Sequence, residues 1–274
     1  MKSFDTKCLV HGDCFDVIEG VPSESVDLII TSPPYADRRK LQYDSVSANE
    51  YVQWFIPLAK EIKRVLKPTG SFILNIKPHC EKGERSLYVF KLVLALVEVV
   101  GFRFTDEFCW TKVGMPGKFK GRFKNAFEPC YHFTVSSNYT FNPYDVATPA
   151  KETSIKRYSR GGGNVTNNGS GFAGLRGGEN KSKLALPSNH LHFPNTLNQF
   201  STNIKHPAVF PIGLCDFFVK AFSNKNDVVL DPFMGSGRVG VSAIRNGRKF
   251  IGIEKKKTFF DLSVSDIELV SINR

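Results

Sequence analysis

The sequence predicts an α/β fold, and two observations lead to that prediction. Over residues 1–141, short apolar runs that end at turn-forming residues alternate with longer segments in which apolar residues recur at helical spacing. The same alternation returns over residues 204–274. Because strands that alternate with helices are typical of an α/β sheet, we expect both segments to fold in this way.

The elements of the first segment follow from its apolar runs and their breaks. Val26–Thr31 is an apolar run that ends at a Pro-Pro pair, which predicts a buried strand leading into a loop. Between residues 50 and 66 the apolar side chains have a helical period, and Lys67-Pro68-Thr69-Gly70 ends that helix. In order, we expect a strand at 26–31, a helix at 50–66, a strand at 71–76, a helix at 87–100 and strands at 102–110 and 128–135.

Residues 142–203 interrupt this alternation. Between Gly161 and Gly178 lie eight of the 22 glycines of the chain, and neither the strand period nor the helix period persists there. Long irregular stretches in compact proteins are usually functional or flexible, so we expect a loop-rich insert. After it, the pattern predicts a helix at 209–222, a strand at 227–231, a helix at 239–246 and a strand at 249–254.

Composition narrows the class of protein. The 274 residues carry 37 Lys and Arg against 26 Asp and Glu, and this net charge of +11 indicates a polyanionic partner. The six cysteines are scattered without C-x-x-C pairs or histidines at zinc spacing, so we expect neither disulfides nor a metal site. The most apolar stretch, residues 87–100, is too short to span a bilayer. We therefore expect a cytoplasmic protein without membrane contact.

A glycine-containing turn, Asp231-Pro-Phe233-Met-Gly235-Ser236-Gly237, follows the predicted strand at 227–231. Glycines at a strand-to-helix turn let the backbone approach a ligand closely, and open α/β sheets bind ligands at the carboxyl ends of their strands. Glu254 ends the next strand, where an acid commonly accepts ribose hydroxyls. The G-x-G-x-x-G and P-loop spacings are absent. The turn therefore predicts a different kind of nucleotide-like cofactor site, and the alternative is a tight turn beside a surface acid.

The second chemical signal is Thr31-Ser32-Pro33-Pro34-Tyr35, at the end of the strand 26–31. The two prolines restrict the chain and remove two backbone donors, which leaves a rigid set of carbonyl acceptors. Ser32 adds a hydroxyl acceptor and Tyr35 an aromatic face. Such a loop suits an exocyclic amine on a flat ring. The alternative is a Pro-Pro loop with Tyr35 as packing, and these residues by themselves do not decide between the two.

Together, Ser-Pro-Pro-Tyr and the later Asp-Pro-Phe-x-Gly-Ser-Gly resemble the β group of S-adenosylmethionine-dependent DNA amino-methyltransferases, as found in bacterial restriction-modification systems. In that group the catalytic motif comes first, the target-recognition region second and the cofactor motif last. The resemblance covers nearly the whole chain outside the insert. Its further matches are Gly12-Asp13, Leu66-Lys-Pro-Thr-Gly-Ser71, Glu128-Pro-Cys-Tyr-His-Phe133 and His206-Pro-Ala-Val-Phe-Pro211.

The resemblance implies a circularly permuted, Rossmann-like methyltransferase sheet of about seven strands, mostly parallel with one antiparallel edge strand. Residues 1–141 would form the catalytic half of the methyltransferase domain, 142–203 a target-recognition insert and 204–274 the cofactor-binding half.

The resemblance also implies residue roles, with S-adenosyl-L-methionine as the methyl donor. Asp13 would hold its adenine and Glu254 its ribose hydroxyls, while the flipped base would lie against the Ser32–Tyr35 loop. His206, at the start of the segment that would close the cofactor pocket, fits equally well as the first residue of a helix. The remaining cofactor residues would be Thr31, Pro207, Phe210, Asp231, Phe233, Gly235, Ser236 and Gly237, and the base-holding residues Ser32, Pro33, Pro34 and Tyr35.

The predicted chemistry needs positioning rather than a covalent nucleophile. Hydrogen bonds from an amine to the Ser32 hydroxyl and the Pro33 carbonyl favour a pyramidal nitrogen aimed at the sulfonium methyl group. A C5-cytosine mechanism would need a cysteine in a Pro-Cys loop, whereas Cys130 follows Pro129 in a strand-like run and is expected to pack in the core. Because a duplex hides the amine, base flipping is expected.

The identity of the base follows from the first position of the catalytic motif. In this family Ser there favours N4 of cytosine and Asp favours N6 of adenine. Ser32 therefore predicts N4-cytosine methylation, with N6-adenine methylation as the alternative.

Basic residues predict the DNA contacts. Residues 112–124 carry five Lys or Arg and no acid, with Phe119 and Phe123 between them, which indicates a loop close to the phosphate backbone. A solvated loop is the alternative. The candidate DNA-binding residues are Lys112, Lys118, Lys120, Arg122 and Lys124 in this stretch and Lys156, Arg157 and Arg160 in the insert.

Two other classes of function compete with this interpretation. A non-catalytic nucleic-acid-binding module has no use for an amine pocket beside a cofactor pocket, so the paired motifs argue against it. An RNA or small-molecule methyltransferase is the other alternative. The basic insert favours a long polyanion but does not separate DNA from RNA. Double-stranded DNA is the expected partner, and the sequence leaves open a companion restriction endonuclease and a homodimer.

Overall fold

The computed structural model describes residues 6–37, 46–81, 83–112, 121–153, 155, 183–194 and 209–272. They divide into two units, one formed by Met1–Phe141 with Asn189–Arg274 and the other by Asn142–Ser188. In its described part, the smaller unit holds a short 3-10 helix, Pro143–Val146, and an antiparallel pair of strands, β8 (Thr148–Pro149) and β9 (Leu184–Ala185). Both sequence motifs lie in the larger unit.

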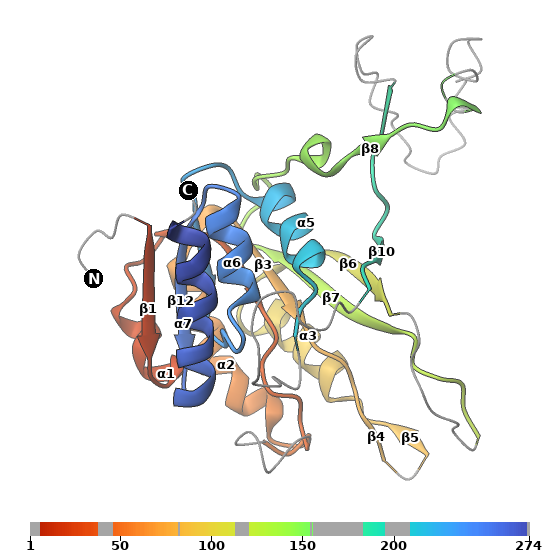
Figure 1. Ribbon diagram of the computed structural model, residues 1–274. Helices are drawn as coiled ribbons and strands as arrows, with labels where there is room; N and C mark the ends of the chain where they lie inside the picture. Colours follow the sequence, from red (N-terminus) through yellow and green to blue (C-terminus); the bar gives the residue numbers. More distant parts are fainter. Residues whose placement is uncertain are drawn as a thin grey trace. The chain divides into compact units, whose positions relative to one another are not determined.

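The larger unit is built on a sheet with the strand order β1-β12-β11-β2-β3-β7-β6-β10 (Figure 1). Among these described strands, every neighbouring pair is parallel except the two pairs that include β7. The predicted α/β class with a mostly parallel sheet is confirmed. The bounds are β1 Lys7–His11, β2 Val26–Thr31, β3 Leu66–Asn75, β6 Arg103–Thr111, β7 Phe127–Thr134, β10 His190–His192, β11 Val228–Asp231 and β12 Lys249–Glu254.

Two details of the sheet differ from the expectation. It has eight strands in the described residues rather than about seven, because β10 pairs in parallel with β6 from His190 opposite Cys109 to His192 opposite Thr111. The antiparallel strand also lies inside the sheet and not at its edge, because β7 pairs with β3 on one side and with β6 on the other. A strand of three residues is too short to show a period of two, so β10 left no signal in the sequence.

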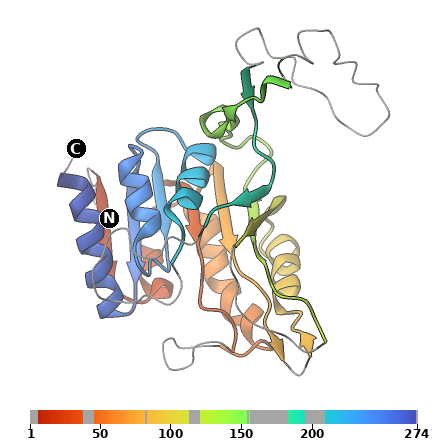
Figure 2. The same ribbon diagram turned by 45° about the vertical axis from the view of Figure 1, so that its right-hand side comes forward.

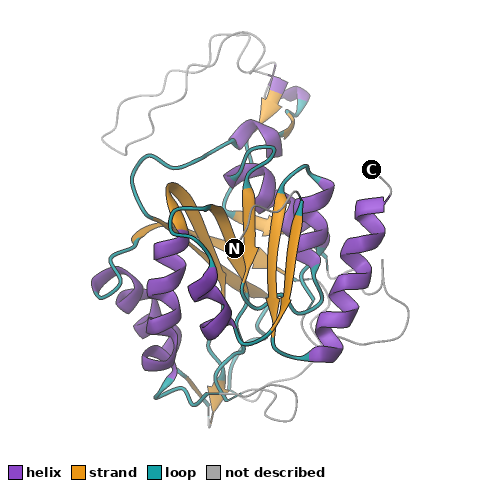
Figure 3. Ribbon diagram, turned by 90° about the vertical axis from the view of Figure 1, so that its left-hand side faces the viewer, coloured by secondary structure: helices purple, strands orange, loops and turns teal. Residues whose placement is uncertain are grey.

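Helices cover both faces of the sheet (Figures 1 and 3). Three of them lie side by side on one face, and α2 and α3, orange and yellow in Figure 2, lie on the other face, where the short α1 packs against α2. No helix within the described ranges is long and apolar enough to cross a membrane. The bounds are α5 Ile212–Phe222, α6 Arg238–Arg245 and α7 Lys257–Ile272 on the first face, and α1 Cys14–Val17, α2 Tyr51–Val65 and α3 Tyr88–Glu98 on the second.

Helix α2 shows how the apolar period produces this packing. Its buried side chains recur at intervals of three or four residues, which places them on one face of the helix against β3 and α3. The chain becomes extended at Leu66, and Pro68 cannot continue a helix. The buried side chains are Tyr51, Phe55, Leu58, Ala59, Ile62 and Val65.

Strand β3 begins at Leu66, five residues before the expected start. Its pairing with β2 passes from Leu66 opposite Val26 directly to Ser71 opposite Leu28, so the Lys67–Gly70 segment forms a bulge. The bulge brings Lys67 Nζ to 2.7 Å from the buried Asp27 carboxylate, which also accepts the backbone N–H of Val228 at 2.9 Å. One acid therefore ties β3, β2 and β11 together.

The order of the strands defines where a ligand can bind. Strands β11 and β2 are neighbours. From β2 the chain proceeds through α2 to β3, towards one edge of the sheet, whereas from β11 it proceeds through α6 to β12, towards the opposite edge. Ligands of open α/β sheets bind outside the carboxyl ends of the strands at such a reversal. The N-terminal strand β1 pairs with β12, near the C-terminal end of the chain, as the predicted circular permutation requires.

Candidate active site

The carboxyl ends of β2 and β11 meet at a buried hydrogen bond. Thr31 Oγ1 donates to Asp231 Oδ1 at 2.7 Å, and the Phe233 backbone N–H donates to the same oxygen at 3.0 Å. The pKa of Asp231 is raised to about 7, chiefly by burial; the hydrogen bonds oppose the rise and the charge of Glu254 adds to it. The two sequence motifs thus lie in contact at the reversal point of the sheet.

The loop after β11 is shaped by two glycines and tied to Glu254. Gly235 and Gly237 have φ values of 52° and 73°, a region that side chains disfavour, and a Cβ on Gly237 would lie 2.8 Å from Ser263 Cβ. The Gly235 N–H donates to Glu254 Oε2 at 2.9 Å, and the Lys256 N–H donates to Oε1 at 2.8 Å. Burial raises the pKa of Glu254. Each carboxylate oxygen can accept more than one hydrogen bond, so both oxygens retain capacity for a further donor.

Asp13 lies at the neighbouring strand end, directly after β1. Its Oδ1 caps α1 by accepting the Phe15 N–H at 3.1 Å, and its Oδ2 lies 3.3 Å from Lys255 Nζ. The Gly12 N–H donates to the Glu254 carbonyl at 3.0 Å, which joins the two strand ends. Asp13, Glu254 and Asp231 therefore lie at the carboxyl ends of three adjacent strands, β1, β12 and β11.

Trp54 packs against two aromatic rings, each of which follows one of these acids by two residues in the chain. The ring of Trp54 in α2 lies 5.4 Å from the ring of Phe15 and 6.2 Å from the ring of Phe233, measured between centroids. Trp54 lies within the helix predicted at 50–66 but was not among the predicted site residues. The available signal was weak, because a partly buried aromatic residue on an amphipathic helix is usually part of the core.

Helix α2 contacts the Ser32–Tyr35 loop through a hydrogen bond. The Tyr51 hydroxyl donates to the Pro34 carbonyl at 2.7 Å, and Pro33 is buried. The Ser32 hydroxyl donates to the Tyr35 oxygen at 3.5 Å. The Pro34 carbonyl therefore accepts a hydrogen bond from α2. The Pro33 carbonyl belongs to the residue that directly follows Ser32 in the chain.

Tyr35 reaches two further strands through its hydroxyl. The oxygen of that hydroxyl lies 3.1 Å from Asn75 Oδ1 and 3.3 Å from Glu128 Oε2, either of which can accept its single proton. Burial raises the pKa of Tyr35 well above its usual value, and the charge of Glu128 raises it further. Asn75 was not singled out from the sequence, and Glu128 was named only as the first residue of a matching segment, because their proximity depends on the register between β3 and β7, which places Asn75 opposite Cys130.

Lys112, a candidate DNA contact, lies beside Glu128. Its Nζ is 2.7 Å from Glu128 Oε1 and 4.1 Å from the centroid of the Trp110 ring, and Lys77 binds the same carboxylate oxygen. Burial favours a raised pKa for Glu128, but the two ammonium groups together hold its pKa below the usual value. Burial also lowers the pKa of Lys112, against the attraction of Glu128. The carboxylate is therefore ionised at neutral pH.

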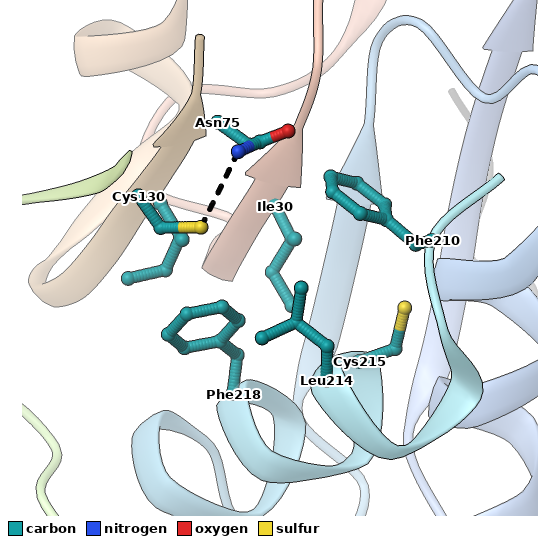
Figure 4. A pocket seen from close by; sticks show the side chains of 8 residues that line it. Ile30, Asn75, Cys130, Phe210, Leu214, Cys215 and Phe218 are labelled. Carbon is teal, nitrogen blue, oxygen red and sulfur yellow. Dashed lines mark hydrogen bonds between the residues drawn. The ribbon is translucent and has the colours of Figure 1, made fainter. Parts of the chain in front are cut away.

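A narrow, mostly apolar pocket lies between the sheet and α5 (Figure 4). Asn75 supplies its polar group and donates from Nδ2 to Cys130 Sγ at 3.5 Å. Phe210, a candidate cofactor residue, also lines the pocket, and its ring lies 6.3 Å from the ring of Trp110. The lining residues are Ile30, Ile73, Asn75, Cys130, Phe210, Leu214, Cys215 and Phe218.

The other candidate residues are unequally described. Ser236 is buried in the loop after β11. Arg122 is partly buried and Lys124 exposed. No cluster of His, Cys, Asp or Glu in the described part of the chain could hold a metal ion, and the six cysteines, all described, are free thiols. His206, Pro207, Lys118, Lys120, Lys156, Arg157 and Arg160 lie outside the described residues.

Comparison with known proteins places this geometry in a family. A family model described as DNA methylase, covering N6 and N4 methyltransferases, matches residues 26–265. That span includes the Ser32–Tyr35 loop and the segment from Asp231 to Glu254. The chain belongs to this family. It is therefore a DNA amino-methyltransferase, as the resemblance of its motifs implied.

The relatives of this DNA methylase include an enzyme named for adenine. The type II methyltransferase M.PvuII of Proteus hauseri is 32% identical over 298 residues, which cover 95% of this chain and 86% of the relative. The DNA adenine methyltransferase YhdJ of Escherichia coli (strain K12) is 26% identical over 277 residues, and the match covers 97% of this chain and 84% of the relative. Membership of the family leaves the choice between cytosine and adenine open.

Solved structures share the fold. The PvuII DNA methyltransferase, described as cytosine-N4-specific, superposes with a TM-score of 0.72 at 26% identity and covers 98% of this chain and 92% of its own. A DNA modification methylase of Thermus thermophilus complexed with S-adenosyl-L-methionine has a TM-score of 0.65 at 19% identity, with coverage of 96% and 93%. The predicted permuted methyltransferase fold is thus confirmed.

Proposed function

We propose that this DNA methylase transfers a methyl group from S-adenosyl-L-methionine to the exocyclic N4 amine of a flipped cytosine in double-stranded DNA. The observation that carries the proposal is the Thr31–Asp231 hydrogen bond of 2.7 Å, because it places the amine-binding loop directly beside the cofactor loop. Ser32 at the first motif position, together with the similarity to a cytosine-N4-specific enzyme, favours cytosine over adenine.

The residues at the three strand ends fit the cofactor. Buried Glu254 retains acceptor capacity for two ribose hydroxyls, and the positive φ angles at Gly235 and Gly237 allow the tight turn that brings the Gly235 N–H to Glu254. Asp13 offers a carboxylate for the adenine amine. Asp231 is buried and its pKa is about 7. Once ionised, it offers a negative charge to the cationic methionine end. When bound, the cofactor supplies an electrophilic methyl group.

The loop residues prepare the amine for attack. An exocyclic amine is a poor nucleophile because its lone pair is delocalised into the ring. Ser32 Oγ and the Pro33 carbonyl would each accept one N–H, which favours a pyramidal nitrogen and directs its lone pair at the methyl carbon. The Tyr51–Pro34 bond holds the loop rigid. The base must leave the duplex to reach these acceptors.

The buried thiols argue against C5-cytosine chemistry. Cys130 and Cys215 line the apolar pocket, and burial raises the pKa of each well above its usual value. A thiol that stays protonated at neutral pH is a poor nucleophile. The site therefore supports direct transfer to nitrogen.

The test is nucleoside analysis of DNA methylated by the purified protein. Unmethylated plasmid DNA would be incubated with S-adenosyl-L-methionine, digested and examined by mass spectrometry. We expect N4-methylcytosine. N6-methyladenine would instead support the alternative base, and 5-methylcytosine would overturn the mechanism. A companion endonuclease, a homodimer and a cytoplasmic location remain predictions.

A further inference from the structure

A backbone carbonyl determines how the Asn75 side chain is oriented. Asn75 Nδ2 lies 2.9 Å from the carbonyl oxygen of Pro129. A carbonyl can only accept, so the amide nitrogen must face it. The amide oxygen then faces the Tyr35 hydroxyl, at 3.1 Å, as an acceptor. The orientation of this amide thus follows from the hydrogen-bond chemistry of its neighbours.

A second acceptor faces the same hydroxyl. Glu128 is buried, with 8% of its side chain exposed, and its Oε2 lies 3.3 Å from the Tyr35 oxygen. Its other oxygen is bound by Lys77 and Lys112, which keep the group ionised. An ionised carboxylate has no proton to donate. Tyr35 therefore meets acceptors at both Asn75 and Glu128.

The hydrogen-bond direction at Ser32 follows from these two acceptors. Tyr35 has one hydroxyl proton and must direct it towards Asn75 or Glu128, so its oxygen faces Ser32 with a lone pair. The Ser32 hydroxyl, 3.5 Å away, donates to that oxygen. With its proton directed at Tyr35, Ser32 presents lone pairs to a base amine.

We propose that Glu128 is a positioning residue which, together with Asn75 and acting through Tyr35, makes Ser32 an obligate acceptor for the target amine. This inference rests on the proposed function of the loop. It gives the Lys77–Glu128–Lys112 cluster a role in the reaction, because a hydrogen-bond donor in place of the Glu128 carboxylate would occupy the Tyr35 oxygen and leave the Ser32 proton without that acceptor. A Ser32 hydroxyl free to rotate would accept equally well from an amine or donate to a base carbonyl.

The test is a double-mutant cycle with Glu128→Gln and Tyr35→Phe. In Glu128→Gln the two lysines require the amide oxygen, so the amide nitrogen faces Tyr35 and donates to it. The Tyr35 oxygen is then occupied, and the Ser32 proton is redirected. We expect kcat of methyl transfer to fall about 10–100-fold, the range for losing one hydrogen bond to a charged group. Calorimetric binding of S-adenosyl-L-homocysteine should change less than about twofold.

The double variant separates positioning from a general structural effect. If Glu128 acts through the Tyr35 hydroxyl, Glu128→Gln should lower kcat no more than about twofold in the Tyr35→Phe background. If the two reductions multiply, the inference is wrong. Glu107→Gln, an exposed acid on β6, is the matched control and should leave kcat unchanged.

Removal of a buried charge can also unfold a protein. If thermal unfolding shows that Glu128→Gln is not folded at the assay temperature, Lys77→Gln with Glu128→Gln takes its place in the same cycle, since that pair keeps the net charge of the cluster. The outcomes distinguish the two proposals. A wild-type protein that forms no N4-methylcytosine would contradict the proposed function, whereas an active wild type with multiplying effects would contradict only the role of Glu128.

Discussion

Asp231 is the proposed cofactor residue for which burial has the clearest expected consequence. A carboxyl with a pKa of about 7 is about one tenth ionised at pH 6 and about nine tenths at pH 8. Because the methionine end of the cofactor is cationic, we expect its affinity to rise about 5–10-fold over that interval. Calorimetric titrations with S-adenosyl-L-methionine at several pH values would measure the rise. Asp231→Asn is the matched variant and should bind with little dependence on pH.

The same pKa shift has a consequence of opposite sign for the protein without cofactor. Since the folded state holds its proton more tightly than the unfolded state, Asp231 contributes stability at low pH that is lost as the pH rises towards about 7. Glu254, whose pKa is also raised by burial, acts in the same direction.

A cofactor affinity that is flat with pH in the wild type, or that rises equally in Asp231→Asn, would contradict the assignment of Asp231.

At the scale of the element, helix α2 connects the two halves of the site. Tyr51, on its first turn, holds the Pro34 carbonyl, and Trp54 lies against Phe15 and Phe233 at the cofactor side. One helix therefore contacts both the Ser32–Tyr35 loop and Phe233 in the loop after β11. A change at the cofactor site should be visible from this helix.

The chain has two tryptophans, Trp54 and Trp110, which makes that expectation measurable. In Trp110→Phe, titration with S-adenosyl-L-homocysteine should change the fluorescence of Trp54, because its ring lies 6.2 Å from that of Phe233. In Trp54→Phe, the remaining Trp110 is buried and its indole N–H donates to the Phe193 carbonyl, so its fluorescence should change only through Phe210, whose ring lies 6.3 Å away. An unchanged Trp54 fluorescence in Trp110→Phe would show that α2 does not report on the proposed cofactor site.

The elements themselves were largely predictable from sequence, and the exceptions have physical reasons. The strand 26–31 was expected with its observed bounds, because six buried residues in a row leave a clear signal. Strand β3 begins early because a bulge carries Lys67 to Asp27, a contact that no periodicity reveals. Strand β1 and helix α7 were not expected; α7 has polar residues distributed among its apolar ones, which obscures the helical period.

The site was predictable where its chemistry is local in sequence. The loops 31–35 and 231–237 carry their own signals, and both lie at strand ends as expected. The network behind Tyr35 was not predictable, because Asn75 and Glu128 meet only through the pairing of β3 with β7. Lys112 was expected to face DNA from its charge, and its contact with Glu128 depends on the pairing of β6 with β7, which places Trp110 opposite Glu128.

At the scale of the whole molecule, the order of the strands explains why the motifs are so far apart in the sequence. Strands β11 and β12 come last in the chain but pair between β2 and the N-terminal strand β1. The proposed cofactor residues therefore come from segments far apart in the sequence, from Asp13 to Glu254. This arrangement leaves the middle of the chain, including residues 142–203, available for another role, and we retain the proposal that this segment reads the DNA target.

The net charge of +11 leads to a prediction about DNA binding. Replacing Lys118, Lys120 and Arg122 by Gln should weaken binding to duplex DNA. Each lost phosphate contact should also reduce the slope of log affinity against log salt concentration by about 0.9. Fluorescence anisotropy of a labelled duplex between about 50 and 200 mM salt would give the slope.

A matched control separates local contacts from the overall field of the protein. Lys60, Lys91 and Lys225 are exposed on other parts of the larger unit, and replacing them by Gln removes the same total charge. If the 112–124 stretch contacts phosphates, its triple variant should reduce the slope by about two to three units while the control changes it far less. Equal reductions in both variants would mean that the net charge, and not this stretch, determines the salt dependence. The affinity would then arise from a diffuse field, and sequence recognition would have to come from other residues.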